Sequence, residues 1–273
     1  MSAPLLIRYK FPKTLRLTKN LPETKWKAAQ EATVKKMTKQ NRNVLITGGT
    51  GILGSAVTKA YLAQGDSVAV TYLFEDEVDR FKEYNPEISE DVTFLFANVT
   101  EEAEVQKTVQ EFLSKFGSLD VLVNIVGGFV GGIPTAELEE NRWDFMMNLN
   151  LKSVFLCCKT VIPHMTERGY GKIINVSARA GLKGEAGLSA YCVSKGGVRT
   201  LTESLAAEVM DSGVNVNAIM PSVMDTPMNR ESMPDEEHDR WVAPADVAKV
   251  ICFLTSDDAA VINGAAIPVY GRA

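Results

Sequence analysis

The sequence predicts an α/β fold, a doubly wound parallel sheet of about seven strands with helices on both faces. Short apolar, β-branched segments alternate with longer amphipathic ones, the pattern of strand–helix–strand units joined by right-handed crossovers. A glycine-rich turn joins the first strand to the first helix. The chain has 273 residues, enough for one large domain with a substantial core.

The first strand–turn–helix unit covers residues 43–65. Residues 43–47 are a short β-branched and apolar run that predicts a buried parallel strand. Apolar residues then recur at helical spacing until Gly65, where the helix is expected to end. Glycines at 48, 51 and 54 would allow a tight turn and close approach to a pyrophosphate, held on the N–H groups that open the helix. The alternative is an ordinary glycine-rich turn.

The later elements continue the same alternation. Further strands are expected at residues 67–73, 91–97, 119–124, 172–176, 214–219 and 266–269. Helices are expected at residues 75–84, 100–116, 137–167, 190–211 and 245–256. Ligands of such sheets bind beyond the carboxyl ends of the strands, so functional residues are sought there.

Composition narrows the class of protein. An apolar fraction of 45% and a charged fraction of 23% are ordinary for a soluble protein, and no run of 18 apolar residues predicts a membrane span. The two histidines are too few and too far apart for a usual zinc site, so no metal is expected. The four cysteines lack CxxC spacing and lie in apolar segments, which indicates buried thiols in a reducing compartment, such as the cytoplasm.

The first 42 residues differ in charge from the rest. They hold eleven Lys or Arg and two Glu, a net charge of +9, whereas the other 231 residues carry −14. We therefore expect a basic extension over 1–42 and a single domain over 43–273. The extension could be an organellar presequence, a polyanion-binding tail or a segment packed on its own acidic domain or oligomer partner, and the last is favoured. Its few aromatic residues argue against a nucleic-acid partner.

Tyr191 and Lys195 are the first candidates for catalysis. Their i, i+4 spacing places both side chains on one face of the helix expected over 190–211. A nearby ammonium favours a phenolate, so the pKa of Tyr191 is expected below its ordinary value of about 10. Such a phenol can act as a general acid or base near neutral pH. An accidental pair is the alternative.

Several motifs, taken together, resemble those of the short-chain dehydrogenases/reductases. The motifs come in that family's order and spacing: Thr47-Gly-x-x-Gly-x-x-Gly54, Asn98-Val99, Asn124-x-x-Gly127, Asn148-Leu-Asn150, Tyr191-Cys-Val-Ser-Lys195 and Pro221. The resemblance covers about residues 42–272 and implies a Rossmann fold.

The resemblance also implies residue roles. Tyr191 would be the catalytic acid/base, Lys195 would bind the nicotinamide ribose and tune Tyr191, and Asn150 would hold a water in a proton relay. The residues implied for cofactor binding are Thr47, Gly48, Gly51, Ile52, Leu53, Gly54, Tyr72, Asn98, Val99, Asn124, Gly127, Tyr191, Lys195, Pro221, Val223 and Thr226. The family further implies a homodimer or homotetramer built on the helices expected at 137–167 and 190–211.

The chain departs from the family pattern at four places. Its glycine spacing is typical of the longer, extended members, Asn98 stands where Asp is usual, and Ser222 stands where Gly usually follows the proline. Thirteen residues before Tyr191, where the family has a substrate-orienting serine, this chain has Ala178. Ser177 is adjacent, but neighbouring strand residues point to opposite faces, so it could substitute only if the loop over 179–190 absorbs one extra residue.

Dihydropteridine reductases, a branch without that serine, are similar to this chain in three short segments. These are residues 127–132, 177–180 and 225–234. Phe129 would lie beside the substrate, or alternatively pack within its loop. Met224 and Met228 would line a substrate lid, or alternatively form core beneath it. Ser177 and Ala178 complete the tentative substrate residues.

The sequence therefore predicts an NAD(P)-dependent oxidoreductase that transfers hydride to a carbonyl or imine-like bond of a small substrate. Quinonoid dihydropterin and a ketone or 3-oxoacyl group are the two substrate classes left open, and a non-catalytic dinucleotide sensor or scaffold is the rival function. Tyr72 and Leu73 at the end of the second strand are neutral, but Glu75, Asp76 and Glu77 follow and would repel a 2′-phosphate. NAD(H) is thus favoured over NADP(H).

Overall fold

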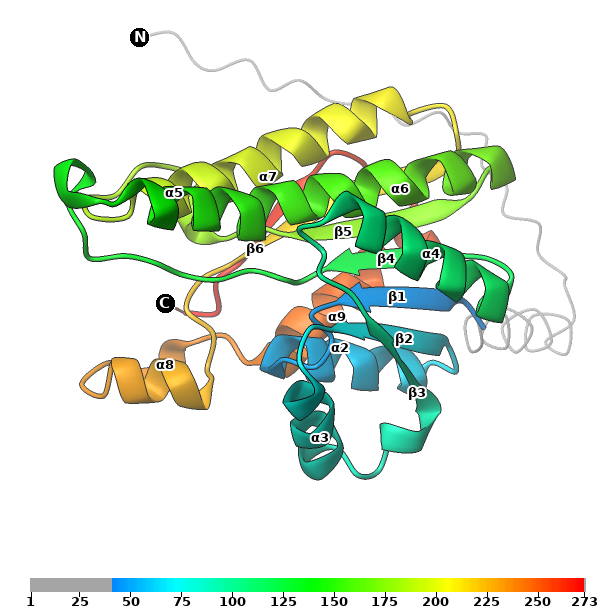
Figure 1. The fold of residues 1–273 in the computed structure, drawn as a ribbon, viewed down its shortest axis with the longest axis horizontal. Coiled ribbons are helices and arrows are strands. Elements are labelled where there is room, and N and C mark those ends of the chain that lie inside the picture. The colour runs from blue at the N-terminus through cyan, green and yellow to red at the C-terminus, as the bar shows by residue number, and fades with distance from the viewer. Residues whose placement is uncertain (1–40, 273) are drawn as a thin grey trace, which may run out of the picture. The chain divides into compact units, whose positions relative to one another are not determined.

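The computed structural model describes residues 41–272, and these form a seven-stranded parallel sheet between two layers of helices (Figure 1). The strand order is β3-β2-β1-β4-β5-β6-β7, the doubly wound arrangement expected from the sequence. The chain reverses its direction of winding between β1 and β4, the point at whose carboxyl edge ligands of such sheets bind. The basic extension predicted over 1–42 lies outside the described residues, except for its last two.

The strands and helices occur close to where the sequence places them. The strands are β1 (Asn43–Thr47), β2 (Ser67–Tyr72), β3 (Val92–Phe96), β4 (Val121–Asn124), β5 (Gly171–Val176), β6 (Val214–Pro221) and β7 (Ala266–Val269). The helices are α2 (Ile52–Ala63), α3 (Glu75–Tyr84), α4 (Glu102–Phe116), α5 (Glu140–Met147), α6 (Ser153–Arg168), α7 (Ser189–Glu208), α8 (Pro227–Ser232) and α9 (Pro244–Leu254).

Each face of the sheet has its own hydrophobic core because alternate strand residues point to opposite sides. Leu45 of β1 faces the layer of α4, α6 and α7, whereas Val44 and Ile46 face α2, α3 and α9. In Figure 1 the first layer lies above the sheet and the second below it. Helices on both faces are what a buried all-parallel sheet requires.

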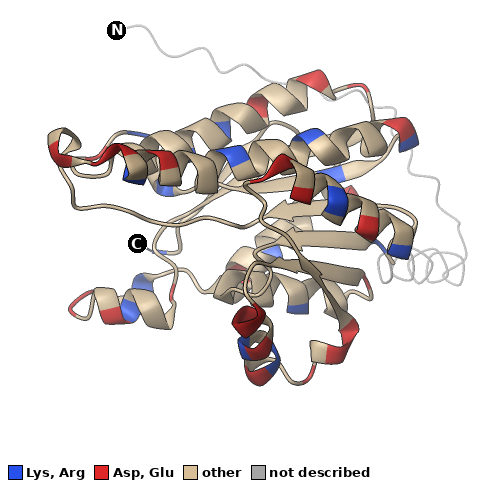
Figure 2. Ribbon diagram, viewed as in Figure 1, with Lys and Arg blue, Asp and Glu red and all other residues tan. Residues whose placement is uncertain are grey.

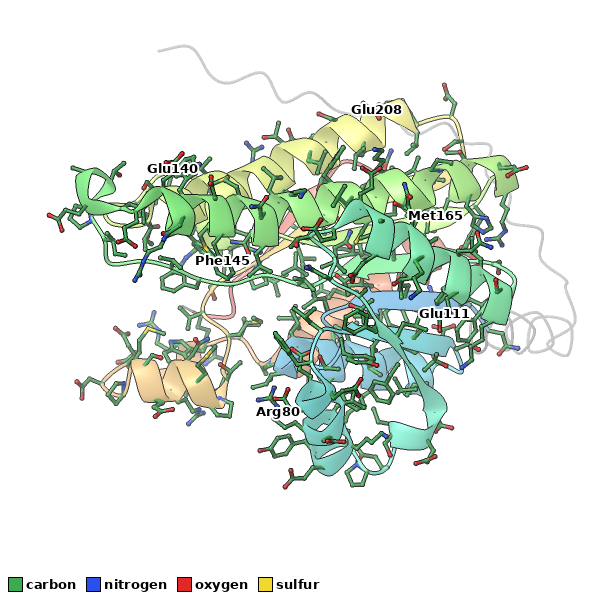
Figure 3. The ribbon with its side chains drawn as sticks, viewed as in Figure 1. Arg80, Glu111, Glu140, Phe145, Met165 and Glu208 are labelled. Atoms are coloured by element: carbon green, nitrogen blue, oxygen red, sulfur yellow. The ribbon has the colours of Figure 1, made fainter. Side chains whose placement is uncertain are left out.

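The helix expected over 137–167 is not uniform. It consists of α5 and α6 joined by a π-helical segment, Asn148–Lys152, in which an extra residue is accommodated in the turn. Residues 140–168 together are long and apolar enough to span a membrane by length and composition alone. However, Val154, Cys158 and Val161 are buried in the core on one face of the sheet, as in a core helix. Phe145, labelled in Figure 3, is 52% exposed on α5.

The amino edge of the sheet is closed by paired charges. Arg42 precedes β1 and Asp66 precedes β2, and their side chains form an ion pair of 2.7 Å that is 4% and 0% exposed, respectively. The Arg42 guanidinium also donates to the Thr255 carbonyl oxygen after α9, at 2.7 Å. Asp120, before β4, accepts from the backbone N–H of Asn43 at 2.8 Å. These bonds fix the start of β1 and therefore the position of the turn that follows it.

Candidate active site

The turn between β1 and α2 has the backbone geometry that its glycines predict. Gly48 has φ of +67°, in the left-handed region, and its N–H donates to Thr71 Oγ1 at 3.1 Å. A Cβ at Gly54 would overlap the Gly48 carbonyl oxygen, so this glycine lets α2 pack against the turn. Gly48 and Gly54 are therefore required by the backbone structure of the turn itself.

Gly51 leaves space for a ligand. A Cβ built there meets only the Gly48 carbonyl oxygen, at 3.5 Å, and points otherwise into open space. Gly51 is also the N-cap of α2, where no side chain caps the unpaired N–H groups and no acidic residue lies in the first turn. These features fit the pyrophosphate of a dinucleotide, because an anion can occupy the uncapped helix end.

Two carboxylates are hydrogen-bonded at the end of β2. Glu77 accepts from the backbone N–H of Leu73 at 2.9 Å, and Glu75 accepts from the Tyr72 hydroxyl at 3.1 Å. Both acidic residues lie in the first turn of α3, whose negative charge is visible in Figure 2. The sequence analysis named Tyr72 as a cofactor-binding residue but did not predict the hydrogen bond from Leu73 to Glu77. The position of Glu77, five residues after the end of β2, was the only indication of that contact.

Asn98 and Asn124, both predicted to bind cofactor, have structural partners. Asn98 Oδ1 accepts from the Thr100 N–H and hydroxyl at 3.1 and 2.7 Å, which shapes the turn into α4. Asn124 is buried, and its Nδ2 donates to Asn175 Oδ1 at 2.8 Å, while Asn175 in turn donates to Thr202 on α7. Asn124 therefore ties β4 to β5 and α7 inside the core.

Tyr191 and Lys195 lie on the first turns of α7, on one face as predicted. Lys195 is buried, and its Nζ donates to the carbonyl oxygen of Val176, the last residue of β5, at 3.0 Å. A Cβ at Gly127 would lie 3.0 Å from Lys195 Nζ and 2.9 Å from Asn150 Oδ1. The loop after β4 thus lies against both side chains, so β4, β5, α7 and the π-helical segment meet at one place.

Asn150 clamps the loop after β4. Its Oδ1 accepts from the Gly128 N–H at 2.8 Å, and its Nδ2 donates to the Gly128 carbonyl oxygen at 3.1 Å and to Ser194 Oγ at 3.0 Å. The family resemblance implies that Asn150 holds a water, but its carboxamide is engaged by Gly128 and Ser194. Gly128 is a site residue that the sequence did not reveal, because only the π-helical segment turns Asn150 toward it.

The pKa prediction for Tyr191 is wrong in direction. Burial raises the pKa of Tyr191 to about 12, and burial lowers the pKa of Lys195 to about 8. Lys195 is engaged by a backbone carbonyl, and it is not among the groups that shift the pKa of Tyr191. At neutral pH Tyr191 therefore keeps its proton, which is the form that can act as an acid.

Phe129 covers Tyr191. The two rings meet edge to face with centroids 4.9 Å apart, and Phe129 is 64% exposed, so it is not a core residue. Gly131 permits this arrangement, since a Cβ there would lie 2.5 Å from Phe129 Cζ. An exposed aromatic ring beside the candidate acid forms one wall for a substrate.

Ser177, the neighbour of Ala178, has a structural partner. Its hydroxyl is buried and donates to the Lys195 carbonyl oxygen at 2.7 Å, so it anchors α7 to the end of β5. Ala178 follows in extended conformation, with φ of −159°. Neighbouring side chains in extended backbone point in opposite directions, so Ala178 lies on the other side from this bond and has no hydroxyl to offer.

The segment after β6 carries the remaining predicted residues. Pro221 ends β6, Thr226 Oγ1 accepts from the Asn229 N–H to cap α8, and Met224 pairs with Val242 in an isolated bridge. Met228 on α8 is 71% exposed, which excludes the alternative that it is core. Figure 1 shows α8 projecting from the body beyond the carboxyl ends of the strands, the place of a lid.

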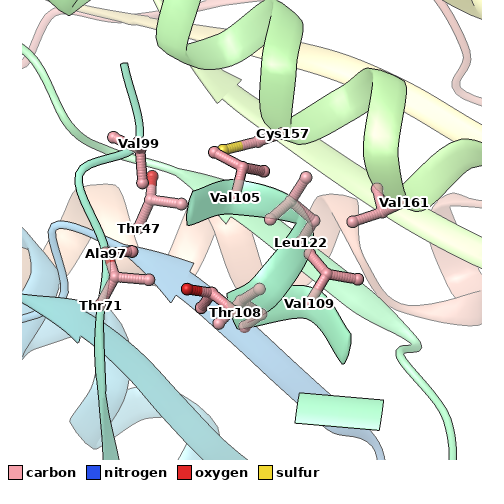
Figure 4. Close-up of a pocket in the computed structure, with 11 residues that line it drawn as sticks. Thr47, Thr71, Ala97, Val99, Val105, Thr108, Val109, Leu122, Cys157 and Val161 are labelled. Atoms are coloured by element: carbon pink, nitrogen blue, oxygen red, sulfur yellow. The ribbon is translucent and has the colours of Figure 1, made fainter. Parts of the chain in front are cut away.

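A small internal cavity lies elsewhere, between the sheet and α4 and α6 (Figure 4). Its volume is about 10 Å³, and its lining is mostly apolar, with Val99, Val105 and Leu122 among the residues that surround it. It has room for no more than about one water and none of Tyr191, Lys195 or Asn150 lines it. It is a packing void and not the substrate site.

The described part of the chain has no cluster of side chains that could bind a metal ion. Among residues 41–272, no group of three or more His, Cys, Asp or Glu is placed to hold a metal ion. The four cysteines are all buried free thiols, and burial raises the pKa of Cys158 to about 12. All four are thus buried thiols, as the sequence predicted.

Comparison with known proteins places these features in a family. Residues 42–237 match the short chain dehydrogenase family. The chain is 31% identical over 236 residues to the 3-oxoacyl-[acyl-carrier-protein] reductase FabG of Thermotoga maritima, covering 83% of this chain and 95% of the relative. It is 32% identical over 246 residues to 2-(R)-hydroxypropyl-CoM dehydrogenase of Xanthobacter autotrophicus, covering 85% and 98%.

A solved structure agrees with the sequence relatives. ElxO with NADP bound superimposes with a TM-score of 0.80 at 28% sequence identity, covering 85% of this chain and 98% of that one. The relatives match nearly their whole length, so the similarity extends over the full described domain and is not confined to the glycine turn.

Proposed function

Because the chain belongs to the short-chain dehydrogenase family and is an NAD(P)-dependent oxidoreductase, we propose that it reduces a carbonyl or imine-like bond of a small substrate. The observation that carries this proposal is the convergence of Tyr191, Lys195 and Asn150 against the loop after β4. The glycine turn, with its open Gly51, would hold the dinucleotide, which supplies the hydride when bound.

Tyr191 is the proposed proton donor. Its raised pKa keeps the Oη proton at neutral pH, which favours the reductive direction, in which the developing anion needs a proton. Lys195 places a positive charge, held by the Val176 carbonyl, on the same helix face. Asn150 acts on the loop that carries Phe129, and it therefore sets the position of the ring that shields Tyr191 from water.

For the substrate we favour a planar, conjugated compound of the quinonoid dihydropterin type. Ala178 provides no hydroxyl for a developing oxyanion, and Ser177 is committed to Lys195. A conjugated ring spreads its charge over several atoms and depends less on one such donor. The exposed face of Phe129 could stack on such a ring.

A 3-oxoacyl substrate is the second candidate. It is favoured by the similarity to a 3-oxoacyl-[acyl-carrier-protein] reductase across 83% of this chain. A non-catalytic dinucleotide sensor is disfavoured, because a buried lysine is expensive to maintain and a simple binding protein has no need of it.

NAD(H) is the proposed cofactor in preference to NADP(H). The Glu77 carboxylate at the end of β2 lies where it would repel a 2′-phosphate and could accept from a ribose hydroxyl. The structural neighbour ElxO was solved with NADP bound, which favours the other cofactor. Titration of both reduced cofactors tests this directly. A clear preference for NADPH would contradict this proposal. Glu77→Gln should reduce the difference between the dissociation constants of NADH and NADPH.

The decisive experiment is an oxidation assay. Purified protein with NADH or NADPH is offered a quinonoid dihydropterin, a series of ketones and a 3-oxoacyl thioester, and absorbance at the nicotinamide band is followed. Turnover of the dihydropterin with the highest kcat/KM would support the favoured substrate. A higher kcat/KM with the thioester would replace it with the second candidate, and no turnover of any class would favour the sensor.

We also propose a homodimer or homotetramer and a cytoplasmic location. Phe145 on α5 and Phe155 on α6 are large exposed apolar side chains, and buried reduced cysteines suit a reducing compartment. A monomeric mass by light scattering at micromolar concentration would contradict the oligomer. The role of the basic extension stays a prediction. If it packs on the acidic domain, its removal should lower the melting temperature.

A further inference from the structure

Arg179 is a cation at the carboxyl edge of the sheet with no acceptor nearby. It opens the short 3₁₀ turn Arg179–Gly181 directly after Ala178, and its side chain is exposed. Gly181 holds this turn tightly beneath α7, since a Cβ there would lie 2.8 Å from the Lys195 carbonyl oxygen. Within residues 41–272 the Arg179 guanidinium forms no ion pair and no hydrogen bond. The guanidinium carbon lies over the face of the Tyr270 ring, 5.8 Å from its centroid.

Tyr270 is brought to Arg179 from the far end of the chain. It follows β7, and its carbonyl oxygen accepts from the Ser222 hydroxyl at 2.8 Å, directly beyond the end of β6. The next residue, Gly271, has φ of +61°, and Arg272 then bonds to the Arg240 carbonyl at 2.9 Å, which fixes the tail. Ser222 stands where the family usually has glycine, so this departure supplies the hydroxyl that anchors Tyr270.

The Tyr270 hydroxyl is buried and has no hydrogen-bond partner among the described residues. A buried polar group without a partner is uncommon and costs stability, so it calls for an explanation. The neighbouring guanidinium offers five N–H donors and no acceptor, and the phenol can also donate. The guanidinium lies over the ring that carries this hydroxyl, and two donor groups without a protein acceptor are complementary to an anion.

We propose that Arg179 and Tyr270 form a subsite for an anionic group of the substrate, a carboxylate or a phosphate. Arg179 follows Ala178 directly, and its turn packs against the backbone of Lys195 on α7, so we assign the subsite to the same substrate. This inference rests on the proposed active site and deepens it. The favoured substrate becomes a conjugated planar compound with an acidic substituent.

The test compares matched substrates. Turnover with NADH is measured for 3- and 4-formylbenzoate and for their methyl esters, which lack the negative charge and carry one additional methyl group. The wild type should favour the carboxylates in kcat/KM by about tenfold or more, and Arg179→Gln should remove most of that preference. Arg179→Lys keeps the charge without the planar fork and should retain part of it. Raising the salt concentration should also reduce the preference.

Two further variants sharpen the result. Lys183→Gln removes an exposed positive charge four residues along the same loop and should leave the carboxylate preference intact. Tyr270→Phe should weaken the preference, but less than Arg179→Gln does. Equal carboxylate preference in wild type and Arg179→Gln would overturn the subsite while leaving the proposed reaction standing.

A binding measurement separates this proposal from the reaction itself. Benzoate and neutral benzamide are titrated calorimetrically into NADH-saturated enzyme. If benzoate binds, benzamide does not, and Arg179→Gln abolishes the binding of benzoate, the subsite is supported even when neither aldehyde is reduced. In that case the proposed reduction of such substrates is wrong, and the subsite stands. Equal binding of benzoate and benzamide would overturn the subsite.

Discussion

At the amino edge of the sheet the buried carboxylates of Asp66 and Asp120 are paired with arginines, whereas at the carboxyl edge the buried Lys195 ammonium has no counter-charge in the described structure. Arg42 and Asp66 face each other at the amino edge, and Arg168 and Asp120 form a second pair there at 2.9 Å. Among residues 41–272 at the carboxyl edge, Lys195 Nζ bonds only to a backbone carbonyl, and the Tyr270 hydroxyl has no hydrogen-bond partner. The amino edge is thus arranged for stability, and the carboxyl edge sacrifices stability for unsatisfied groups that a ligand can meet.

The largest expected effect is on the amino edge. Asp66→Asn leaves the Arg42 guanidinium buried without a counter-charge, so it should lower the free energy of unfolding by about 3–5 kcal/mol. Denaturant unfolding measures this, and kcat of the folded fraction should be unchanged. Asp246→Asn, which breaks the exposed Lys249–Asp246 pair, is the control and should cost no more than about 1 kcal/mol. Equal losses in the two variants would contradict the comparison.

Lys195→Met should have the opposite effect on stability at the carboxyl edge. Burial holds the pKa of Lys195 at about 8, below its ordinary 10.5. Below pH 8 the folded protein must bury the charge, so removing the lysine should stabilise the fold by up to about 3 kcal/mol. Between pH 8 and 10.5 the folded state releases the proton before the unfolded state does, so wild-type stability rises relative to the variant.

The measurement for Lys195→Met is a melting curve at several pH values, together with turnover. The variant should melt higher than wild type at pH 7, the gap should close toward pH 10, and turnover should be lost. A variant that melts lower at pH 7 would mean that the Nζ bond to Val176 outweighs the burial of charge.

Tyr191→Phe should separate activity from stability completely. Loss of the proposed proton donor should lower kcat at least ~10²-fold, about 3 kcal/mol of activation free energy. The Phe129 contact needs only the ring, so the melting temperature and the dissociation constant of NADH should stay near wild type. Steady-state kinetics and a cofactor titration check both. Near-normal turnover would remove Tyr191 from the proposed mechanism.

The smallest effects are expected at the end of β5. Ser177→Ala deletes the hydrogen bond to Lys195 and should cost about 1 kcal/mol of stability while turnover stays within about twofold. Ala178→Ser should raise turnover of simple ketones without improving that of the favoured substrate. A large loss of turnover in Ser177→Ala would make Ser177 the missing donor and would weaken the dihydropterin proposal.

The fold followed from periodicity because apolar strands and amphipathic helices are local patterns. Residues 43–47, 75–84 and 266–269 were predicted with the bounds that the structure has. The pairing of Tyr191 with Lys195 on one helix face was equally local. The pKa of Tyr191 was not, because it depends on burial, which is set by the packing of segments distant in the chain.

Other parts of the site depend on contacts between distant segments. Asn150 meets Gly128, and Arg179 meets Tyr270, only after β4, β5 and β7 have been assembled. The amino-acid composition of residues 148–152 does not predict a π-helical turn. Its formation is set by how α5 and α6 pack on the rest of the chain.

The π-helical turn makes the direction of the Asn150 side chain depend on the number of residues in the segment that joins α5 to α6. Each residue of an α-helix rotates the chain by about 100°, so deleting one residue from Asn148–Lys152 would restore a regular helix and swing α5 by that angle around α6. The Asn150 side chain would then no longer point toward Gly128, and its hydrogen bond with the Gly128 N–H would be lost. Chain length between Glu140 and Arg168 is therefore fixed to the single residue, although much of this stretch lies at the surface.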